Sequence, residues 1–296
     1  MRRVAAHDGQ EGAAYVEFLI AFVPLFIMFL GMIQMSLMYA GDLVVQHAAS
    51  RAARAAVVVI DDDPARYEGA ARREVQPEGS SSGPSGLGGL IGVIGGGGGA
   101  GGNVGGPRLA AIRSAASMPL SAISPSMDQL VDPDSVRTAI GSAESRAATG
   151  VFLYNDTAMG VTFPTSPGAE SYRQRFGLDT QVTTRVTYLF HCAVPVAANI
   201  MCETYPTLRL GPGAAIAESI IRDVGSGTLS WEEARARLER IGDSAARSNR
   251  DQPGLDELES SGSSSLLFAT WGTGARFKLM RGEATMPLQS ARYEYR

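Results

Sequence analysis

A single apolar run, from Ala13 to Gly41, constrains this chain more than any other feature. Its only formal charge is Glu17. The charge-free part from Phe18 to Gly41 is about 24 residues long, and a helix that spans a bilayer needs roughly 20. We therefore predict a transmembrane helix. Since a charged side chain in such a helix costs a few kcal/mol, about 3 at the bilayer centre, Glu17 is a candidate functional residue.

A secretory signal peptide is the alternative interpretation of this run. Its apolar region would be shorter, about 7 to 15 residues, and would end in a small-residue cleavage site followed by polar sequence. Here predicted helix continues through the segment from Asp42 to Ile60, which is rich in alanine and precedes a stop at Pro64. A helix from Ala13 to Ile60 would be about 72 Å long, more than twice the bilayer core, so half of it should stand outside the membrane.

The alanines of this outer half have two explanations. Their small side chains would let another backbone approach closely, which suits side-by-side helix packing. Alanine also favours helix wherever it occurs, so composition alone does not decide between the two. The alanines concerned are Ala48, Ala49, Ala52, Ala53, Ala55 and Ala56.

The rest of the chain is long enough to form a folded head outside the membrane. Hydrophobic residues make up 45% and charged residues 19% of the 296, which suits one domain with a sizeable core. A stretch rich in glycine and serine, 79–106, is typical of a flexible linker. We expect five segments: a leader (1–12), a transmembrane and stalk helix (13–60), a connecting segment (61–78), the linker (79–106) and the head domain (107–296).

Beyond the linker the pattern mixes short helices with strands. Helices are predicted over 134–148 and 230–246, the second opened by a capping box in which Ser230 and Glu233 satisfy two free backbone donors. Helices segregated from mostly antiparallel strands indicate an α+β fold, with the long helix as a stalk that leads into the head. Strands are predicted, from the alternation of β-branched or aromatic residues with polar ones, at 151–154, 160–163, 180–190, 265–271 and 275–279.

Two cysteines, Cys192 and Cys202, bracket a turn after the longest predicted strand. A disulfide between them would close a short loop and stabilise the head by roughly 2 to 3 kcal/mol. We expect them to pair, since a head outside the cytoplasm would meet an oxidising compartment. A zinc site with the neighbouring His191 is not expected, because the C-x-x-C spacing and a fourth ligand are missing.

No motif for catalysis, metal binding or nucleic-acid binding stands out. The chain has three histidines and no H-E-x-x-H or G-K-[ST] motif, although a Ser/His/acid site assembled in space would leave no such motif. The run from Asp61 to Asp63, before Pro64, is interpreted as a solvated helix end rather than a cation site. A net charge of -4, with basic residues spread singly, gives no footprint for nucleic acid. We therefore predict no enzyme activity, no cofactor and no metal.

The chain resembles the N-terminal module of the TadE/TadG-like family of tight-adherence (type IVc) pilus proteins over the segment GAAYVEFLIAFVPLFIMFLGMIQMSLMYAGDLVVQHAASRAARAAVV. The shared marks are Gly12, the pair Val16 and Glu17, Pro24 within the membrane span, and Ala52 to Arg54. The resemblance covers about the first fifth of the chain. The von Willebrand-like domain of the larger TadG-type relatives is not recognisable, which favours a TadE-like protein.

The resemblance implies a pilin-like protein whose short basic leader is removed by a prepilin peptidase after Gly12, so that Ala13 becomes the new N-terminus. Residues one and five of the trimmed helix, Ala13 and Glu17, lie on one face, one turn apart. In a stack of helices the carboxylate of Glu17 could meet the freed α-amino group of a neighbouring subunit, and the two charges would neutralise each other. The alternative is that Glu17 only snorkels to the interface.

The function implied by the resemblance is that of a minor pilin, or pseudopilin, which acts in assembly or priming of a tight-adherence pilus and hence in surface adhesion. Its expected partners are other pilin or pseudopilin subunits, the prepilin peptidase, the inner-membrane assembly platform and the membrane. The expected location is the bacterial inner membrane, with a cytoplasmic N-terminus and a periplasmic head, and the protein either stays there or enters an extracellular pilus. The alternative is a periplasmic binding or enzymatic domain for which residues 13–60 are a simple anchor. A type II secretion pseudopilin is disfavoured by Ala13, where phenylalanine is usual.

Overall fold

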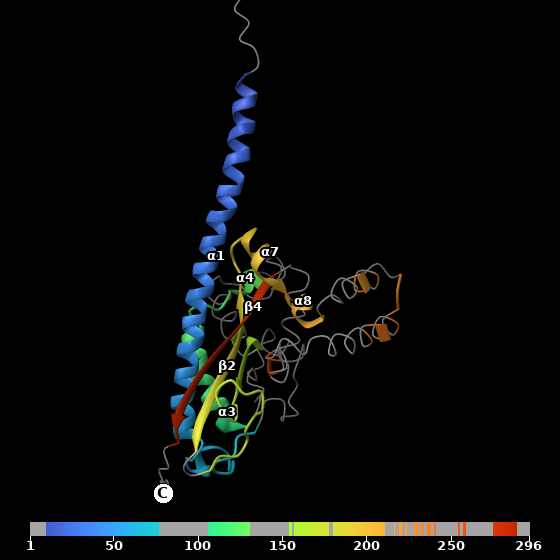
Figure 1. Cartoon of the computed structure of the whole chain (residues 1–296). Coiled ribbons are helices and arrows are strands. Elements are labelled where there is room, and N and C mark those ends of the chain that lie inside the picture. Colours follow the sequence, from blue (N-terminus) through green and yellow to red (C-terminus); the bar gives the residue numbers. More distant parts are fainter. Residues whose placement is uncertain are drawn as a thin grey trace, which may run out of the picture.

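The computed structural model describes residues 10–76, 106–130, 154–155, 157–177, 180–210 and 275–288, together with scattered residues from 216 to 258. Within them a long helix, α1, stands out from a head of short helices and an antiparallel sheet (Figure 1). The predicted α+β class is therefore confirmed. The helix predicted at 134–148, the strand predicted at 265–271 and the predicted linker, apart from its last residue, lie outside the described residues.

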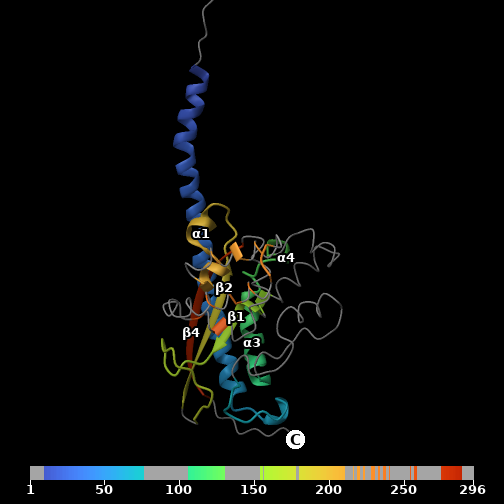
Figure 2. The same ribbon diagram turned by 90° about the vertical axis from the view of Figure 1, so that its right-hand side faces the viewer.

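Helix α1, Gln10–Val59, is one unbroken element of 50 residues (Figures 1 and 2). It confirms that the helix of the apolar run continues into the alanine-rich segment. The acidic run that follows organises the end of α1: Asp61 pairs with Arg73 at 3.0 Å, and the side chain of Asp63 caps the short 3-10 helix η1 (Pro64–Arg66). These aspartates therefore contact neighbouring segments of the chain at the helix end.

The described part of the sheet has four strands in the order β1-β2-β4-β3, and every neighbouring pair is antiparallel. The predictions at 160–163 and 180–190 are confirmed to within one residue. The third prediction, 275–279, falls on the first part of a longer strand. The strands are β1 (Met159–Thr162), β2 (Gln181–His191), β3 (Glu203–Thr204) and β4 (Arg276–Pro287).

Strand β4 is longer than predicted because β2 gives it a partner along its whole length. Pairing runs from Phe277 opposite His191 to Pro287 opposite Gln181. The middle of β4 contains Gly282 between two charged residues. This stretch therefore lacks the alternation of apolar and polar residues that predicts a strand.

The strand predicted at 151–154 is wrong at its described end, since Tyr154 is helical. The Tyr154 hydroxyl donates to the carbonyl oxygen of Leu189 on β2. Pairing of β1 with β2 ends at Tyr188, one residue earlier. At Leu189 the backbone of β2 is therefore paired with the Tyr154 side chain, and not with the backbone of the strand predicted at 151–154.

Short helices complete the described head. Of the helix predicted at 230–246, the described residues beyond Ser230 are helical, and Ser230 Oγ accepts the backbone N–H of Glu233 at 3.3 Å. This is one of the two hydrogen bonds of the predicted capping box, and the Glu233 carboxylate accepts from the Ser230 hydroxyl at 3.1 Å instead of from the Ser230 backbone N–H. The other helices are α3 (Pro107–Leu120), α4 (Met127–Leu130), α7 (Ala197–Met201) and α8 (Tyr205–Leu210).

The alanine-rich face of α1 packs inside the head. Helix α1 contacts α3 and the strands β2 and β4, and these elements lie together in Figures 1 and 2. Close approach of another backbone was one of the two explanations for these alanines, and here the approaching backbone belongs to the same chain. The fully buried residues of this face include Val45, Ala48, Ala49, Ala52, Ala53 and Ala56.

Gly282 marks the closest approach of α1 to the sheet. A Cβ added there would lie 2.7 Å from the carbonyl oxygen of Val45 and 2.9 Å from the Cα of Gln46, so the helix backbone occupies the space of a side chain. The Gln46 amide completes the contact. It donates to the carbonyl oxygen of Glu283 at 2.7 Å and accepts the Glu283 N–H at 3.3 Å, as a neighbouring strand would. Both observations show why a glycine interrupts β4 at this position.

We expect Gly282→Ala to destabilise the head, because helix and sheet must separate to admit the methyl group. Overpacking of this kind costs about 1–3 kcal/mol, and each kcal/mol lowers the melting temperature of a domain of this size by about 2–4 °C. Thermal unfolding of the full chain in detergent, followed by circular dichroism, measures the effect. Gly31→Ala is the matched control, since nothing lies within 4 Å of a Cβ added there. An equal melting temperature for the two variants would contradict the proposed contact.

Candidate functional site

The N-terminal half of α1 lies outside the head and is the first candidate site. Every side chain from Tyr15 to Phe29 is exposed, and almost all are apolar. Among the described residues α1 is the one helix long and apolar enough to cross a membrane (Figure 1). An apolar surface of this extent is not stable in water, and it fits a membrane-anchored protein.

Two faces of this exposed half differ in chemistry. Glu17, Pro24 and Gly31 are seven residues apart, which places them close together on one face of the helix. Phe18, Phe22 and Phe26 lie on roughly the opposite face and stack, with ring centroids 5.2 and 5.6 Å apart. The first face combines small side chains with the charge of Glu17, so it would let a neighbouring helix approach more closely than the aromatic face.

The predicted site residues of α1 fall on this exposed half. Gly12 and Ala13 lie near the start of the helix, and Pro24 lies inside it without ending it. Because proline has no N–H, the carbonyl oxygen of Ile20 loses its usual helical partner. Glu17 is exposed and has no hydrogen bond or ion pair with any described residue. One copy of the chain therefore offers this carboxylate no described partner.

A second exposed surface follows α1 alongside the head. Its residues are four apart, so they form one line along the helix. The part nearest the exposed half is apolar, and the distant part is polar and basic. We call it the α1 strip, and it consists of Met35, Tyr39, Leu43, His47 and Arg51.

Cys192 and Cys202 are joined by a disulfide, with their Cα atoms 6.5 Å apart. The loop that they close contains α7 and rests on α1 through Gln34. Gln34 Oε1 accepts the N–H of Val194 at 3.2 Å, and its Nε2 lies 3.9 Å from the Sγ of Cys202. Gln34 is completely buried and is the first buried side chain along the described part of α1. It therefore marks the point where the helix enters the head.

His191 lies beside the disulfide, at the end of β2. Its ring packs edge-on against Phe277, with ring centroids 5.7 Å apart. Burial lowers the pKa of His191 below its usual value of 6.5. Since both cysteines belong to the disulfide, neither thiolate is available to share a metal with this imidazole.

The second face of the sheet carries a buried ionic cluster around Arg185 of β2. Arg185 Nε donates to Glu283 at 2.6 Å, one Nη donates to Glu257 at 3.1 Å, and the other donates to the carbonyl oxygen of Ala169 at 2.7 Å. Glu257 also accepts from the hydroxyls of Thr187 and Tyr172. Each of these carboxylates is held by several donors, so the cluster ties loops to the sheet and offers no free acid or base.

A second arginine, Arg108, organises the distant end of the head. It donates to the carbonyl oxygens of Val59, Asp62 and Ala70, and its guanidinium lies 4.5 Å from the ring centroid of Tyr67. The last turn of α1 has no basic residue of its own, so Arg108 supplies the cation that the helix C-terminus favours.

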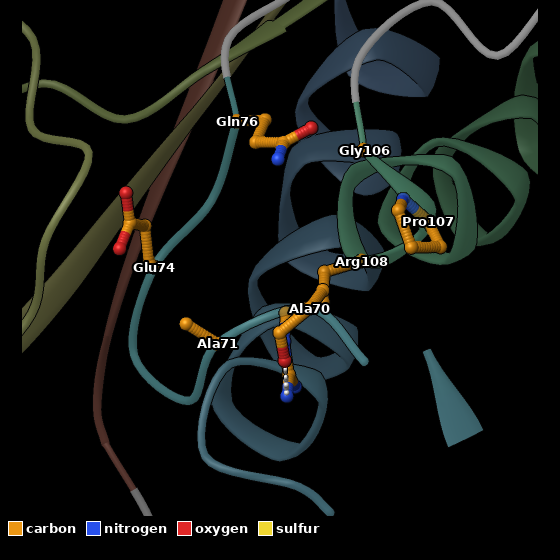
Figure 3. A pocket seen from close by; sticks show the side chains of 7 residues that line it. All are labelled: Ala70, Ala71, Glu74, Gln76, Gly106, Pro107 and Arg108. Carbon is orange, nitrogen blue, oxygen red and sulfur yellow. Dashed lines mark hydrogen bonds between the residues drawn. The ribbon is translucent and has the colours of Figure 1, made fainter. Parts of the chain in front are cut away.

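The pocket beside Arg108 is small, about 150 Å³. Figure 3 shows the Arg108 side chain directed towards Ala70, where the dashed line marks its hydrogen bond. Both terminal nitrogens of the guanidinium are thus occupied by backbone oxygens, and neither is free to bind an anion. The pocket is lined by Ala70, Ala71, Glu74, Gln76, Gly106, Pro107 and Arg108.

Sequence reasoning missed Gln34, Arg108 and the Arg185 cluster. Gln34 had a usable signal, because it is a lone amide within an apolar run. Arg108 and Arg185 had none, since their partners lie 15 to 98 residues away along the chain.

Residues 12–54 match the family model described as TadE-like protein. The match confirms the resemblance over the exposed half of α1 and most of its buried half. It covers 43 of the 296 residues and does not extend to the sheet. No curated protein and no solved structure matches the chain.

We expect acid to weaken the head partly through His191. The lowered pKa means that the folded protein binds fewer protons than the unfolded chain once the pH falls below about 6.5. This contribution to stability is complete above pH 6.5 and is lost as the pH falls through the folded-state pKa. The difference in melting temperature between His191→Gln and wild type should therefore be smaller at pH 5 than at pH 8.

The matched control is His47→Gln, which removes an exposed histidine of α1. Its difference in melting temperature from wild type at each pH is the baseline with which that of His191→Gln is compared. If the pH dependence of His191→Gln equals that of this control, the half-buried imidazole of His191 does not contribute to acid sensitivity.

Proposed function

We propose that this chain is a minor pilin, or pseudopilin, of a tight-adherence pilus, and that it acts in assembly by packing α1 against the helices of other subunits. The TadE-like match over residues 12–54 supports the family. The observation that carries the proposal is the state of Glu17. It is a carboxylate in an apolar helical surface, outside the head, with no described partner in its own chain.

An unpaired carboxylate in lipid is costly, so a second molecule that neutralises it gains free energy. Cleavage after Gly12 would create such a partner, because Ala13 would then carry a free α-amino group one helical turn from Glu17. A neighbouring helix shifted along its axis can present this amine to Glu17. Correctly stacked subunits would satisfy both charges, and wrongly stacked subunits would leave both unpaired.

The shape of the molecule is compatible with stacking. The face with Glu17, Pro24 and Gly31 has no cover from the head, and the α1 strip remains exposed further along. A neighbouring helix could therefore follow α1 for most of its length. The apolar residues of the α1 strip, Met35 to Leu43, would bury against it, and the basic residue Arg51 would reach the rim of the contact.

The proposed topology places the N-terminus in the cytoplasm and the head in the periplasm, anchored in the bacterial inner membrane. The disulfide of the head supports an oxidising compartment. In this arrangement the partners are the prepilin peptidase, the assembly platform of the inner membrane and the other pilin subunits.

We expect Glu17→Gln to abolish or greatly reduce piliation while the head stays folded, because the amide keeps the shape of the side chain and removes its charge. Pili are counted by electron microscopy, and the melting temperature of the purified variant reports on the head. Glu68→Gln is the matched control, since it makes the same chemical change at an exposed residue beyond α1 and should leave pili unchanged. Normal fibres with Glu17→Gln would remove the basis of the assembly proposal and favour a simple anchor.

A second expectation concerns processing. Gly12→Val should block removal of the leader, because a branched side chain replaces the small residue at the proposed cleavage position. Intact mass of the membrane-extracted protein measures this, and the variant should be heavier than wild type by the twelve-residue leader plus the mass change of the substitution. Equal processing of the two proteins would show that Gly12 is not the cleavage position.

A further inference from the structure

We propose that the loop closed by the disulfide, residues 192–202, is a second membrane contact. We call it the foot loop. It would lie on the outer surface of the bilayer that α1 crosses, with Val196 and Ile200 inserted into the interface. The proposal rests on membrane insertion of α1 and does not depend on pilus assembly.

The foot loop has the composition of an interfacial segment. Between its two cysteines it contains no charged residue, and Asn199 is its only polar side chain. The disulfide fixes both ends of the loop, so presenting apolar side chains at its tip loses little additional conformational freedom.

In the foot loop the small apolar side chains are buried and the large ones are exposed, which is the reverse of what is favourable in water. Helix α7 buries its small residues Ala197 and Ala198, whereas the large apolar side chain of Ile200 is 71% exposed. Val196, just before the helix, is 43% exposed. A loop that faced only water would gain by turning the large side chains inward. The arrangement is favourable when the outward side meets hydrocarbon.

The backbone conformation of Val196 supports this interpretation. Its φ of 66° lies in the left-handed region, which is rare for a β-branched residue and costs about 1–3 kcal/mol. The strain persists because the disulfide and the hydrogen bond from Val194 to Gln34 hold the loop on both sides. The loop thus keeps Val196 outward at a cost in conformational energy.

The position of Gln34 places the foot loop at the bilayer surface. From Ala13 to Gln34 the helix rises about 32 Å, close to the roughly 30 Å thickness of the hydrocarbon core. If α1 begins at one boundary of the core, Gln34 therefore emerges at the other. Val194 and Cys202 both contact Gln34, so the foot loop lies at that level. Figures 1 and 2 agree, since α7 lies at the end of the head from which α1 projects.

Charged residues return immediately outside the loop, as expected at the edge of an interfacial segment. Glu203 follows Cys202 and is exposed, and Arg276 donates to the carbonyl oxygen of Cys202 at 3.2 Å. Lys278, also exposed, is the next outward residue of β4. Only the tip of the loop would therefore enter the interface, and these charges would stay among the headgroups.

The bilayer is a better occupant than a second copy of the chain. The foot loop and the membrane-crossing half of α1 leave the head at the same end, so contact with lipid follows from the insertion of α1 alone. A second copy would need a complementary apolar surface at the same height. Exposed apolar residues of the α1 strip begin at Met35, but they lie on a helix face that already suits packing with other helices.

Depth-dependent fluorescence quenching tests the proposal on the full chain. Ile200→Cys is labelled with an NBD fluorophore, and non-reducing mass analysis checks that the native disulfide is retained. The protein is placed in vesicles of phosphatidylethanolamine and phosphatidylglycerol that contain lipids with a nitroxide near the headgroup or deep in the acyl chain. We expect the label at 200 to be quenched several-fold more strongly by the shallow nitroxide than by the deep one.

Two further labels calibrate the result. Val58→Cys carries an exposed label on α1 about 36 Å beyond Gln34, and neither nitroxide should quench it. Phe22→Cys lies within the span and should be quenched most by the deep nitroxide. The foot loop proposal is overturned if the label at 200 is quenched no more than that at 58. A blue-shifted but unquenched label at 200 would also overturn it, because that result indicates cover by protein. Absence of quenching at Phe22→Cys would overturn it too, because α1 would then not span the membrane. Loss or retention of pili in the Glu17→Gln strain has no bearing on these outcomes, so the two proposals can fail separately.

Discussion

The contact between α1 and strand β4 is the constraint on which the rest of the structure depends. At Gly282 the strand has no side chain, and the backbone of α1 occupies the space that one would need. Gln46 then pairs with the backbone of Glu283 as though the helix were another strand. The buried alanines of α1 let α3 pack beside the same contact. The helix is therefore the central support of the head as well as its connection to the membrane.

Helix α1 both supports the head and connects it to the membrane, and the two parts of the helix meet at Gln34. From Tyr15 to Phe29 the helix is exposed on all sides and almost entirely apolar, so lipid or other helices must cover it. After Gln34 one face belongs to the head and the other carries the α1 strip. Because the helix is continuous through this point, a force or a contact on its exposed half acts directly on the sheet. A subunit built in this way can be held by its helix while its head keeps its fold, which is the property that the proposed pilin role requires.

Sequence reasoning succeeded where a local pattern reports on structure and failed where the partner is distant. The length of α1, its end before Pro64 and the strands near 160–163 and 180–190 follow from periodicity, proline chemistry and β-branched residues, all of which act within a few residues. The extension of β4 could not be predicted, because pairing with β2 stabilises a stretch that contains Arg281, Gly282 and Glu283. Arg108 and Arg185 could not be predicted for the same reason, because only the fold brings their partners near. Glu17 was found because a charge in an apolar run is informative by itself, without knowledge of its partner.

The most direct test of the account is a cysteine-accessibility scan of α1 in intact membranes with a maleimide that cannot cross them. The native cysteines are paired and would not react. Membrane insertion and packing of α1 predict no labelling from Tyr15 to Ile33, and from Gln34 onward a helical period in which positions 51 and 58 react while positions 49 and 53 do not. Labelling at positions 22 or 26 without detergent would contradict membrane insertion of the exposed half. Uniform labelling beyond Gln34 would contradict the packing of α1 against the sheet.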